Sequence, residues 1–423
     1  MADHPVLERF SPAVRAWFSS SFPEPTPAQV EGWPEIAGGR HTLICAPTGS
    51  GKTLTAFLSA IDRLVTSPVP PDRERRTRVL YLSPLRALAF DVEKNLRAPL
   101  AGIQLAADRL GAPYTEPVVG VRTGDTSARD RQKLIRRPPD LLITTPESLY
   151  LMLTSSARDT LVGVEAVIVD EIHALAPTKR GAHLALSLER LEEITERSPQ
   201  RIGLSATQRP LEEVATFLGG FEAPRRARPV SIVDVGIRKP LEVQVVVPVE
   251  DMGDLGKETT ELRSGPASVA MAPVRKSIWP SIYPPILELV LQHRSTIIFC
   301  NGRRLTERMA ARLNELADSE GVLGPGGPDP DGAQVELVRA HHGSLAREQR
   351  VVIEDQLKRG ELRGLVATSS LELGIDMGAV DLVIQIESPG AVSRGLQRIG
   401  RAGHQVGEPS RGYIFPKHRG DLL

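Results

Sequence analysis

Short apolar runs alternate with longer stretches of helical periodicity through the first half of the chain. The runs lie at 42–45, 79–82, 141–144, 166–169 and 202–204, and the helical patterns include 54–65, 87–100 and 184–194. A strand that is apolar throughout is buried on both faces, which is typical of a parallel sheet covered by helices. The first half is therefore predicted to be an α/β domain.

The same alternation returns after a break that is rich in Pro, Gly and charged residues. This break, from 225 to 285, holds one strand-like run at 241–247. The later runs lie at 296–300, 335–338, 365–368, 382–386 and 412–415, and the helical patterns at 286–291, 305–316, 345–358 and 392–399. We predict two α/β domains, 1–230 and 231–423, with a linker near 225–240 and an irregular insertion near 250–280.

Composition places the chain among soluble globular proteins. It has 423 residues, of which 41% are hydrophobic and 25% charged. There is no apolar run of about 18 residues and no apolar leader at the N-terminus, so we expect no membrane span, no signal peptide and a cytoplasmic location. The two cysteines, Cys45 and Cys300, end apolar runs and are expected to be buried thiols, and no cysteine spacing indicates zinc.

The net charge of zero counts mildly against a nucleic-acid partner. Lys plus Arg and Asp plus Glu both number 52, whereas nucleic-acid-binding domains are often basic. Short arginine clusters at 73–76, 136–137, 225–226 and 303–304 leave room for a local basic groove, although solvated surface charge is the favoured explanation for each cluster.

A glycine-rich stretch between a predicted strand and a predicted helix indicates a phosphate-binding loop. It reads Ala46-Pro47-Thr48-Gly49-Ser50-Gly51-Lys52-Thr53, with Ala46 where glycine is usual. Backbone N–H groups of such a loop surround phosphate oxygens, and the helix N-terminus adds partial positive charge. Lys52 can reach the β- and γ-phosphates, and the Thr53 hydroxyl can bind Mg²⁺. The expected ligands are therefore ATP or another nucleoside triphosphate and Mg²⁺.

Two carboxylates follow the apolar run 166–169. We expect this strand to lie beside the strand that precedes the phosphate-binding loop, so that Asp170 joins the Mg²⁺ shell. Glu171, one residue further, can orient and deprotonate an attacking water. A kinase does not need this second carboxylate, so the pair favours hydrolysis of the triphosphate over its transfer.

The run Asp170-Glu171-Ile172-His173 and the motifs around it resemble a superfamily 2 nucleic-acid helicase core of two RecA-like domains. Residues 25–29 resemble the adenine-recognising Q motif, in which Thr26 and Gln29 face ATP and the Gln29 amide can pair with adenine. The resemblance implies that His173, Ser205 and Thr207 couple ATP to strand contact, and that Gly374 and Asp376 contact ATP from the second domain.

The resemblance also implies a set of strand contacts. In the first domain these are Pro84, Leu85, Arg86, Gly124, Thr145, Pro146 and Glu147, and in the second Asn301, Arg303, His342, Gly343, Thr368 and Ser369. Because only 4% of the chain is aromatic, we expect phosphate contacts through backbone, hydroxyl and arginine groups rather than base stacking. Such binding is independent of base sequence and weakens steeply with salt.

The run 397–404, Gln-Arg-Ile-Gly-Arg-Ala-Gly-His, matches helicase motif VI. An arginine that stabilises charge on the transferring phosphoryl group can supply ~10³–10⁵ in rate. The resemblance implies that Arg401, and secondarily Arg398, reach from the second domain to ATP held by the first.

Three details resemble the large helicase-related (Lhr) family: the sequence Asp-Glu-Ile-His, the run 175–181 after it, and His404 at the end of motif VI. This resemblance implies a nucleoid-associated, monomeric core that moves 3′-to-5′ on single-stranded DNA and unwinds tailed DNA or RNA–DNA duplexes. Family members carry winged-helix and further domains after the core, and we expect these parts to be missing from the present chain.

Several alternatives stay open on the residues alone. An RNA helicase of the DEAD-box or Ski type shares most of these motifs, and an ATP-gated nucleic-acid clamp would share the binding residues without unwinding. A P-loop transporter is disfavoured because no LSGGQ-like run is present. The aromatic residues Trp17, Phe18 and Phe22 fit either stacking on adenine or packing of an N-terminal helix.

Overall fold

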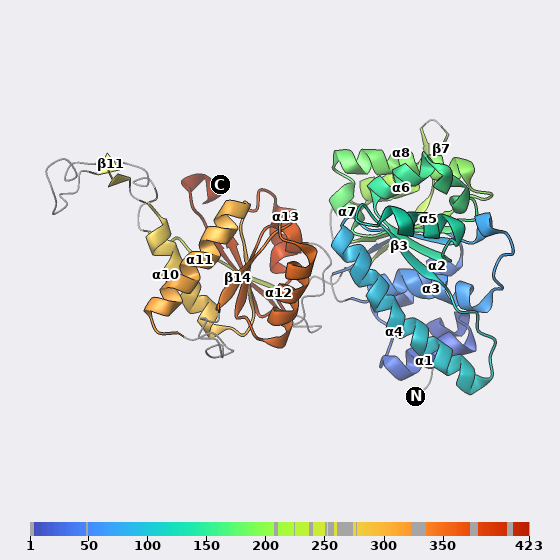
Figure 1. The fold of residues 1–423 in the computed structure, drawn as a ribbon, viewed down its shortest axis with the longest axis horizontal. Helices are drawn as coiled ribbons and strands as arrows, with labels where there is room; N and C mark the ends of the chain where they lie inside the picture. The colour runs from blue at the N-terminus through green and yellow to red at the C-terminus, as the bar shows by residue number, and fades with distance from the viewer. Residues whose placement is uncertain are drawn as a thin grey trace. The chain divides into compact units, whose positions relative to one another are not determined.

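The computed structural model of the chain forms two compact units, residues Met1–Arg238 and Lys239–Leu423 (Figure 1). It describes residues 4–47, 50–206, 210–223, 225–236, 240–249, 252, 258–259, 274–275, 277–322, 336–372, 380–403 and 409–422. Within these ranges, no helix has both the length and the apolar character that a membrane crossing requires.

A parallel sheet organises the described part of the first unit. Its strand order is β3-β4-β2-β5-β6-β1-β9, and each neighbouring pair is parallel. The strands are β1 (His41–Cys45), β2 (Val79–Leu82), β3 (Val119–Arg122), β4 (Leu141–Thr144), β5 (Ala166–Val169), β6 (Gln200–Ser205) and β9 (Val230–Asp234), with a separate hairpin of β7 (Phe221–Ala223) and β8 (Arg226–Ala227).

Helices cover both faces of this sheet, because alternate strand residues point to opposite sides. Ile44 and Ile168 pack with helices α1 to α4, whereas Leu43 and Val167 pack with α6 to α9. The helices are α1 (Pro12–Ser21), α2 (Pro27–Ala37), α3 (Lys52–Thr66), α4 (Arg86–Leu110), α5 (Ala128–Arg136), α6 (Pro146–Leu153), α7 (Ile172–Leu175), α8 (Lys179–Ile194) and α9 (Leu211–Gly219), with short 3₁₀ turns at Pro5–Arg9, Arg73–Arg75 and Ser156–Leu161.

The boundary between the units lies after Arg238, which is eight residues beyond the predicted division at 230/231 and within the predicted linker near 225–240. The cause is β9, which pairs with β1 from His41↔Val230 to Cys45↔Asp234. Its residues are only partly buried because β9 is an edge strand, and the apolar pattern that marks the central strands is therefore weak. Strand β3, which contains Gly120 and Arg122, lies at the opposite edge and has a similarly weak pattern.

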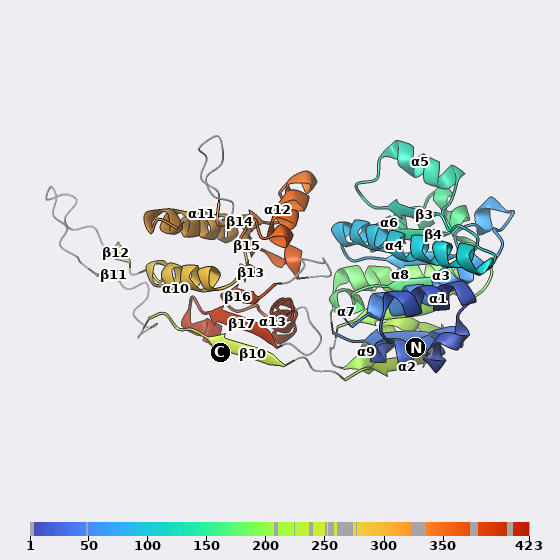
Figure 2. The same ribbon diagram turned by 90° about the horizontal axis from the view of Figure 1, so that it is seen from below.

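The second unit repeats the design on a smaller scale. Its sheet has the order β10-β17-β16-β13-β15-β14, again with parallel neighbours, and Figure 2 shows β10 and β14 at its two edges. The elements are β10 (Leu241–Val245), β13 (Thr296–Phe299), β14 (Val338–His341), β15 (Gly364–Ala367), β16 (Leu382–Ile386), β17 (Ser410–Phe415), α10 (Trp279–Gln292), α11 (Arg303–Ser319), α12 (Arg347–Arg359), α13 (Val392–Ile399), the 3₁₀ turns Ser369–Leu371 and Arg419–Leu422, and a small pair β11 (Glu258–Thr259) and β12 (Val274–Arg275).

Strand β14 begins three residues later than the predicted run 335–338. The side chain of Asn314 on α11 accepts from the backbone N–H groups of Leu337 and Val338 and donates to the Val338 carbonyl, which fixes where the strand starts. Arg339 and His341 can belong to the strand because an edge strand tolerates polar residues. Most of the predicted insertion near 250–280 lies outside the described residues.

The structure settles an alternative that the sequence left open for Trp17 and Phe18, whereas Phe22 is 39% exposed and its stacking on adenine stays a prediction. Phe18 is 1% exposed and Trp17 is 8% exposed, and both lie in the core with Trp33. Phe18 packs edge-on against Trp33 with ring centres 5.4 Å apart. These rings therefore stabilise the fold of the first unit. Cys45 and Cys300 are buried, as predicted.

We expect Trp33→Ala to destabilise the first unit selectively. The ring is fully buried against Phe10 and Phe18, so its removal leaves a large cavity and costs about 3–5 kcal/mol in free energy of unfolding. Urea unfolding followed by circular dichroism should show an earlier transition for the first unit only, because the second unit has its own core. A loss below 1 kcal/mol would contradict this placement of the ring.

Candidate active site

The predicted site residues of the first unit follow the carboxyl ends of its strands. The phosphate-binding loop follows β1, Asp170 and Glu171 follow β5, and Ser205 ends β6. Since all strands are parallel, these ends share one edge of the sheet, where α/β proteins bind ligands. Strand β6 lies between β1 and β5, so the prediction that the Asp170 strand is next to the loop strand is wrong. The two strands are instead joined through β6.

The described part of the phosphate-binding loop has the backbone shape that such a loop requires. Gly51 has φ +78° and caps α3, whose first residue is Lys52. The Lys52 side chain is buried and its Nζ lies 3.4 Å from the Ala46 carbonyl oxygen, so it folds back over its own loop. Thr53 is exposed at the start of the helix. Pro47 accepts from the Ser50 hydroxyl, while Thr48 and Gly49 lie outside the described residues.

The Q-motif residues brace this loop. The Thr26 hydroxyl donates to the Ser50 carbonyl at 2.8 Å, and the Thr26 N–H donates to Gln29 Oε1 at 2.9 Å. A Cβ atom on Gly51 would lie 2.8 Å from Gln29 Nε2, so glycine is needed both for φ and for space. The structure therefore brings Thr26 and Gln29 to the loop, and the contact of Gln29 with adenine stays a prediction.

Asp170 is a buried carboxylate with two partners. Tyr81 of β2 donates its hydroxyl to Asp170 Oδ2 at 2.5 Å, and the Glu171 N–H donates to Oδ1 at 2.9 Å. Burial, and then the charge of Glu171, raise the pKa of Asp170 to about 7, against the opposing effects of Tyr81 and Lys52. Tyr81 was not predicted as a site residue, because it lies 89 positions away and has the pattern of an ordinary apolar strand residue.

Glu171 and His173 form a bridge to the end of β6. Glu171 is buried with φ +45°, an uncommon conformation for a residue with a side chain, and it caps α7. His173 Nε2 lies 3.5 Å from Glu171 Oε2, and His173 Nδ1 accepts from the Ala206 N–H at 3.1 Å. Since Nδ1 accepts, the ring proton of a neutral His173 is on Nε2 and faces Glu171. The geometry joins the predicted base to the end of β6, while Thr207 lies outside the described residues.

The predicted strand-contact loops of the first unit lie at the same edge of the sheet. Arg86, which begins α4 after β2, forms an ion pair of 2.5 Å with Asp125 after β3. A Cβ on Gly124 would lie 2.6 Å from the Arg86 guanidinium, so the two loops are in contact. Thr145 caps α6 by accepting from the Ser148 N–H. Pro146 and Glu147 form the first turn of that helix, and Leu85 packs against the core.

In the second unit, the predicted strand-contact residues also follow strand ends. Asn301 and exposed Arg303 follow β13, His342 and Gly343 follow β14, and Thr368 and Ser369 follow β15. His342 is buried and its Nε2 lies 3.1 Å from Glu307 Oε1, whereas Gly343 faces open space. These strands are neighbours at one end of the sheet, in the order β13-β15-β14, so the structure brings the residues to a common edge.

Arg398 is held inside the second unit by groups from several elements. It donates to Glu372 from Nε at 2.7 Å and also from Nη2, and from Nη1 to Gln385 at 2.7 Å and Asn301 at 3.1 Å. Its guanidinium also lies over the Phe299 ring. These contacts favour a positioning role over the predicted contact with nucleotide.

Arg401, in contrast, remains a candidate for the nucleotide. It is 8% exposed, and Nη2 donates to the Glu372 carbonyl at 2.8 Å. The predicted ATP contacts Gly374 and Asp376, and also His404, lie outside the described residues.

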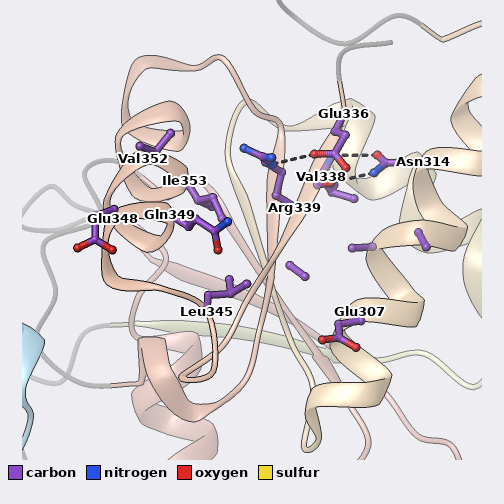
Figure 3. A pocket seen from close by; sticks show the side chains of 13 residues that line it. Glu307, Asn314, Glu336, Val338, Arg339, Leu345, Glu348, Gln349, Val352 and Ile353 are labelled. Carbon is purple, nitrogen blue, oxygen red and sulfur yellow. Dashed lines mark hydrogen bonds and ion pairs between the residues drawn. The ribbon is translucent and has the colours of Figure 1, made fainter. Parts of the chain in front are cut away.

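A pocket of about 500 Å³ opens in the second unit between α11, β14 and α12 (Figure 3). Val338 and Ile353 are among its aliphatic side chains, and Glu307 and Glu348 also line it. Because Glu307 also bonds His342, the pocket borders a predicted strand-contact loop.

The residues at the end of β1 and β5 fit a magnesium–nucleotide complex. No cluster of three or more His, Cys, Asp or Glu side chains suited to a metal is found in the described ranges. Mg²⁺ in nucleotide sites is held by one or two protein oxygens together with phosphates and water, so such a cluster is not required. The Thr53 hydroxyl and the Asp170 carboxylate would supply those oxygens, and the ion would neutralise charge on the phosphates.

Family models match most of the chain. A model described as DEAD/DEAH box helicase matches residues 26–214, and one described as Helicase conserved C-terminal domain matches residues 283–405. The chain is 53% identical to the Lhr helicase/probable uracil glycosylase of Mycolicibacterium smegmatis, over 99% of this chain and 27% of the relative. It is 42% identical to the ATP-dependent helicase Lhr-Core of Methanocaldococcus jannaschii, over 100% of this chain and 45% of the relative. The chain thus spans less than half the length of these curated relatives.

A solved structure is also similar to this chain. The Mycobacterium smegmatis helicase Lhr, bound to single-stranded DNA and AMP-PNP, is 54% identical with a TM-score of 0.83, over 99% of this chain and 49% of that one. The predicted fold class, two tandem RecA-like domains that each hold a mostly parallel sheet flanked by helices, is confirmed.

We expect Asp170→Asn to flatten the pH dependence of stability in nucleotide-free, EDTA-treated protein. Because the pKa of Asp170 is raised in the folded state to about 7 from 3.8, the folded chain binds the proton more tightly than the unfolded chain does. The resulting stabilisation is present at low pH and is lost as pH rises towards 7, with a slope of up to about 1.4 kcal/mol per pH unit. Urea unfolding between pH 4.5 and 8 should show this slope in the wild type only. Parallel curves for the two proteins would contradict the expectation.

Proposed function

Since the chain belongs to the DEAD/DEAH-box helicases and is similar to the Lhr helicases, we propose that it is a nucleic-acid-stimulated ATPase that unwinds duplexes. In this proposal it moves 3′-to-5′ on single-stranded DNA and separates tailed DNA or RNA–DNA duplexes. The observation that carries the proposal is that Lys52, Asp170, Glu171 and His173 meet at the sheet edge that also bears the loops at Arg86 and Thr145. The solved relative that binds single-stranded DNA and AMP-PNP supports DNA as the strand.

Hydrolysis would use the groups that the first unit holds in place. Lys52 would leave the Ala46 carbonyl for the β- and γ-phosphates, and Glu171 would take a proton from the attacking water. His173 contacts Glu171 through Nε2 and the Ala206 N–H through Nδ1. Movement of Glu171 during the ATPase cycle would therefore shift His173 and, through it, the end of β6. This bridge is the proposed route from hydrolysis to strand contact.

The strand would be held through its phosphates. Arg86 is exposed and paired with Asp125, and phosphate can replace that carboxylate as a guanidinium partner. Exposed Gly343 and Ser369 in the second unit offer backbone and hydroxyl groups. Such contacts do not read base sequence, which suits a motor that must travel over any sequence. Arg401 would supply the positive charge that stabilises the phosphoryl group in the transition state.

Two other functions fit some of the same residues. An ATP-dependent RNA helicase would use the same strand loops, and an ATP-gated clamp would use the same ATP site without unwinding. The deciding experiment measures ATPase and strand separation on duplexes with 3′ or 5′ tails made of DNA, of RNA, or of one strand of each. The proposal expects activity on 3′-tailed substrates with a DNA loading strand. Activity on RNA loading strands alone would favour the RNA helicase, and hydrolysis without separation would favour the clamp.

Lys52→Ala and Glu171→Gln are each expected to lower DNA-stimulated ATPase by at least about 10²-fold, with unchanged circular dichroism. Lys52→Ala removes the cation for the phosphates, and Glu171→Gln removes the base while keeping the side-chain shape. Lys94→Ala, at an exposed position of α4, is the matched control and should retain full turnover. Full turnover in either of the first two variants would refute the assignment.

Arg401→Ala is expected to lower the rate of ATP hydrolysis by about 10³- to 10⁵-fold, while nucleotide still binds. Binding of a fluorescent ATP analogue should change little, because the loop around Lys52 is intact. Arg411→Ala, which removes an exposed arginine from β17, serves as the control. An Arg401→Ala protein that hydrolyses ATP at the wild-type rate would remove this residue from the mechanism.

A further inference from the structure

Arg180, near the start of α8, forms a fork between two loops that the proposed function assigns to the strand. Its Nε lies 2.6 Å from Glu147 Oε1, and its Nη2 donates to the Pro84 carbonyl at 2.8 Å. The arginine lowers the pKa of Glu147 against the effect of burial, so the carboxylate stays charged. Neither the ATP site nor the predicted strand contacts include Arg180.

The fork joins elements that follow three neighbouring strands. Pro84 follows β2, Glu147 lies in α6 after β4, and Arg180 lies in α8 after β5, with β2 between the other two strands. The element after β5 also carries Glu171 and His173. Arg180 therefore lies a few residues after Glu171 and His173 in the chain, and it is hydrogen-bonded to the loops at Pro84 and Glu147.

A tight turn makes this connection stiff. The Thr178 hydroxyl donates to the Leu175 carbonyl at 2.7 Å and accepts from the Gly181 N–H at 3.1 Å. A Cβ on Gly181 would lie 2.1 Å from the Leu175 oxygen, so only glycine allows α8 to start this close to α7. Movement of α7, which bears His173, must then be passed to Arg180.

We propose that Arg180 is a positioning residue that couples the hydrolysis element to the grip of the first unit on the nucleic-acid strand. The proposal rests on the proposed function, because it takes the loops at Pro84 and Glu147 as strand contacts. Nε and Nη2 of Arg180 both point at protein acceptors, so we expect its effect on the strand to pass through those loops. A lysine at this position could not serve both acceptors with a planar fork.

The test compares Arg180→Ala and Arg180→Lys with the control Lys179→Ala, which removes a neighbouring exposed charge from the same helix turn. For each protein, ATPase is measured without DNA and across a titration of single-stranded DNA, and DNA affinity is measured from 50 to 200 mM salt. Circular dichroism confirms the fold of each variant, and Arg180→Lys keeps the test valid if the alanine variant unfolds.

We expect both Arg180 variants to need about 10-fold more DNA for half-maximal stimulation, with DNA-free ATPase within about twofold of wild type. The salt dependence of DNA affinity should keep its slope, because no phosphate contact is lost. A direct phosphate contact would instead lower the slope by about one and would be rescued by lysine. That outcome, or variants that behave like Lys179→Ala, would overturn the inference.

Failure of the proposed function would look different. If the wild-type chain shows no stimulation of ATPase by any nucleic acid, the proposed function fails, and the inference about Arg180 falls with it. If the wild type is stimulated and the Arg180 variants match it, the function stands and the positioning role falls.

Discussion

The common direction of the strands is the constraint on which the candidate site depends. In each unit the described sheet is parallel, so every strand ends at the same edge and every loop after a strand emerges there. Backbone hydrogen bonding across β1, β6 and β5 fixes the spacing between the phosphate-binding loop and the carboxylates at Asp170 and Glu171. Without that alignment, residues 117 positions apart in the chain, such as Thr53 and Asp170, would have no reason to share one ligand.

Charge is concentrated in the most buried part of the site. Asp170 and Glu171 are adjacent carboxylates at the end of a buried strand, and burial together with their repulsion raises the pKa of Asp170. Tyr81 and Lys52 oppose that shift through a hydrogen bond and a positive charge. A divalent cation with bound phosphates would relieve the same repulsion, which suits these two carboxylates to the proposed ligand.

Polar side chains tie the loops of this edge to one another. Thr26 holds the phosphate-binding loop, His173 links Glu171 to the end of β6, and Arg86 links the loops after β2 and β3. In the second unit, Arg398 ties the loop after β13 to Glu372 through Asn301 and its own fork. Each tie joins segments that are separate in the chain, so motion of one segment can be passed to another. That property is what a motor driven by a chemical cycle needs.

The sequence by itself determined the two α/β halves, the central strands and the identity of the phosphate-binding loop and its carboxylates. These features are local: fully buried strands such as β4 and β5 are continuous apolar runs, and the loop is a contiguous motif. Only the tertiary structure decided that β9 belongs to the first sheet, that Tyr81 holds Asp170, and that Arg180 spans Pro84 and Glu147. Edge strands are half exposed and lack a clear apolar pattern, and partners such as Tyr81 and Asp170 meet only because the sheet brings distant segments together. The pattern of apolar and polar residues along the chain indicates burial and local conformation. Which distant segments contact one another is decided by tertiary packing.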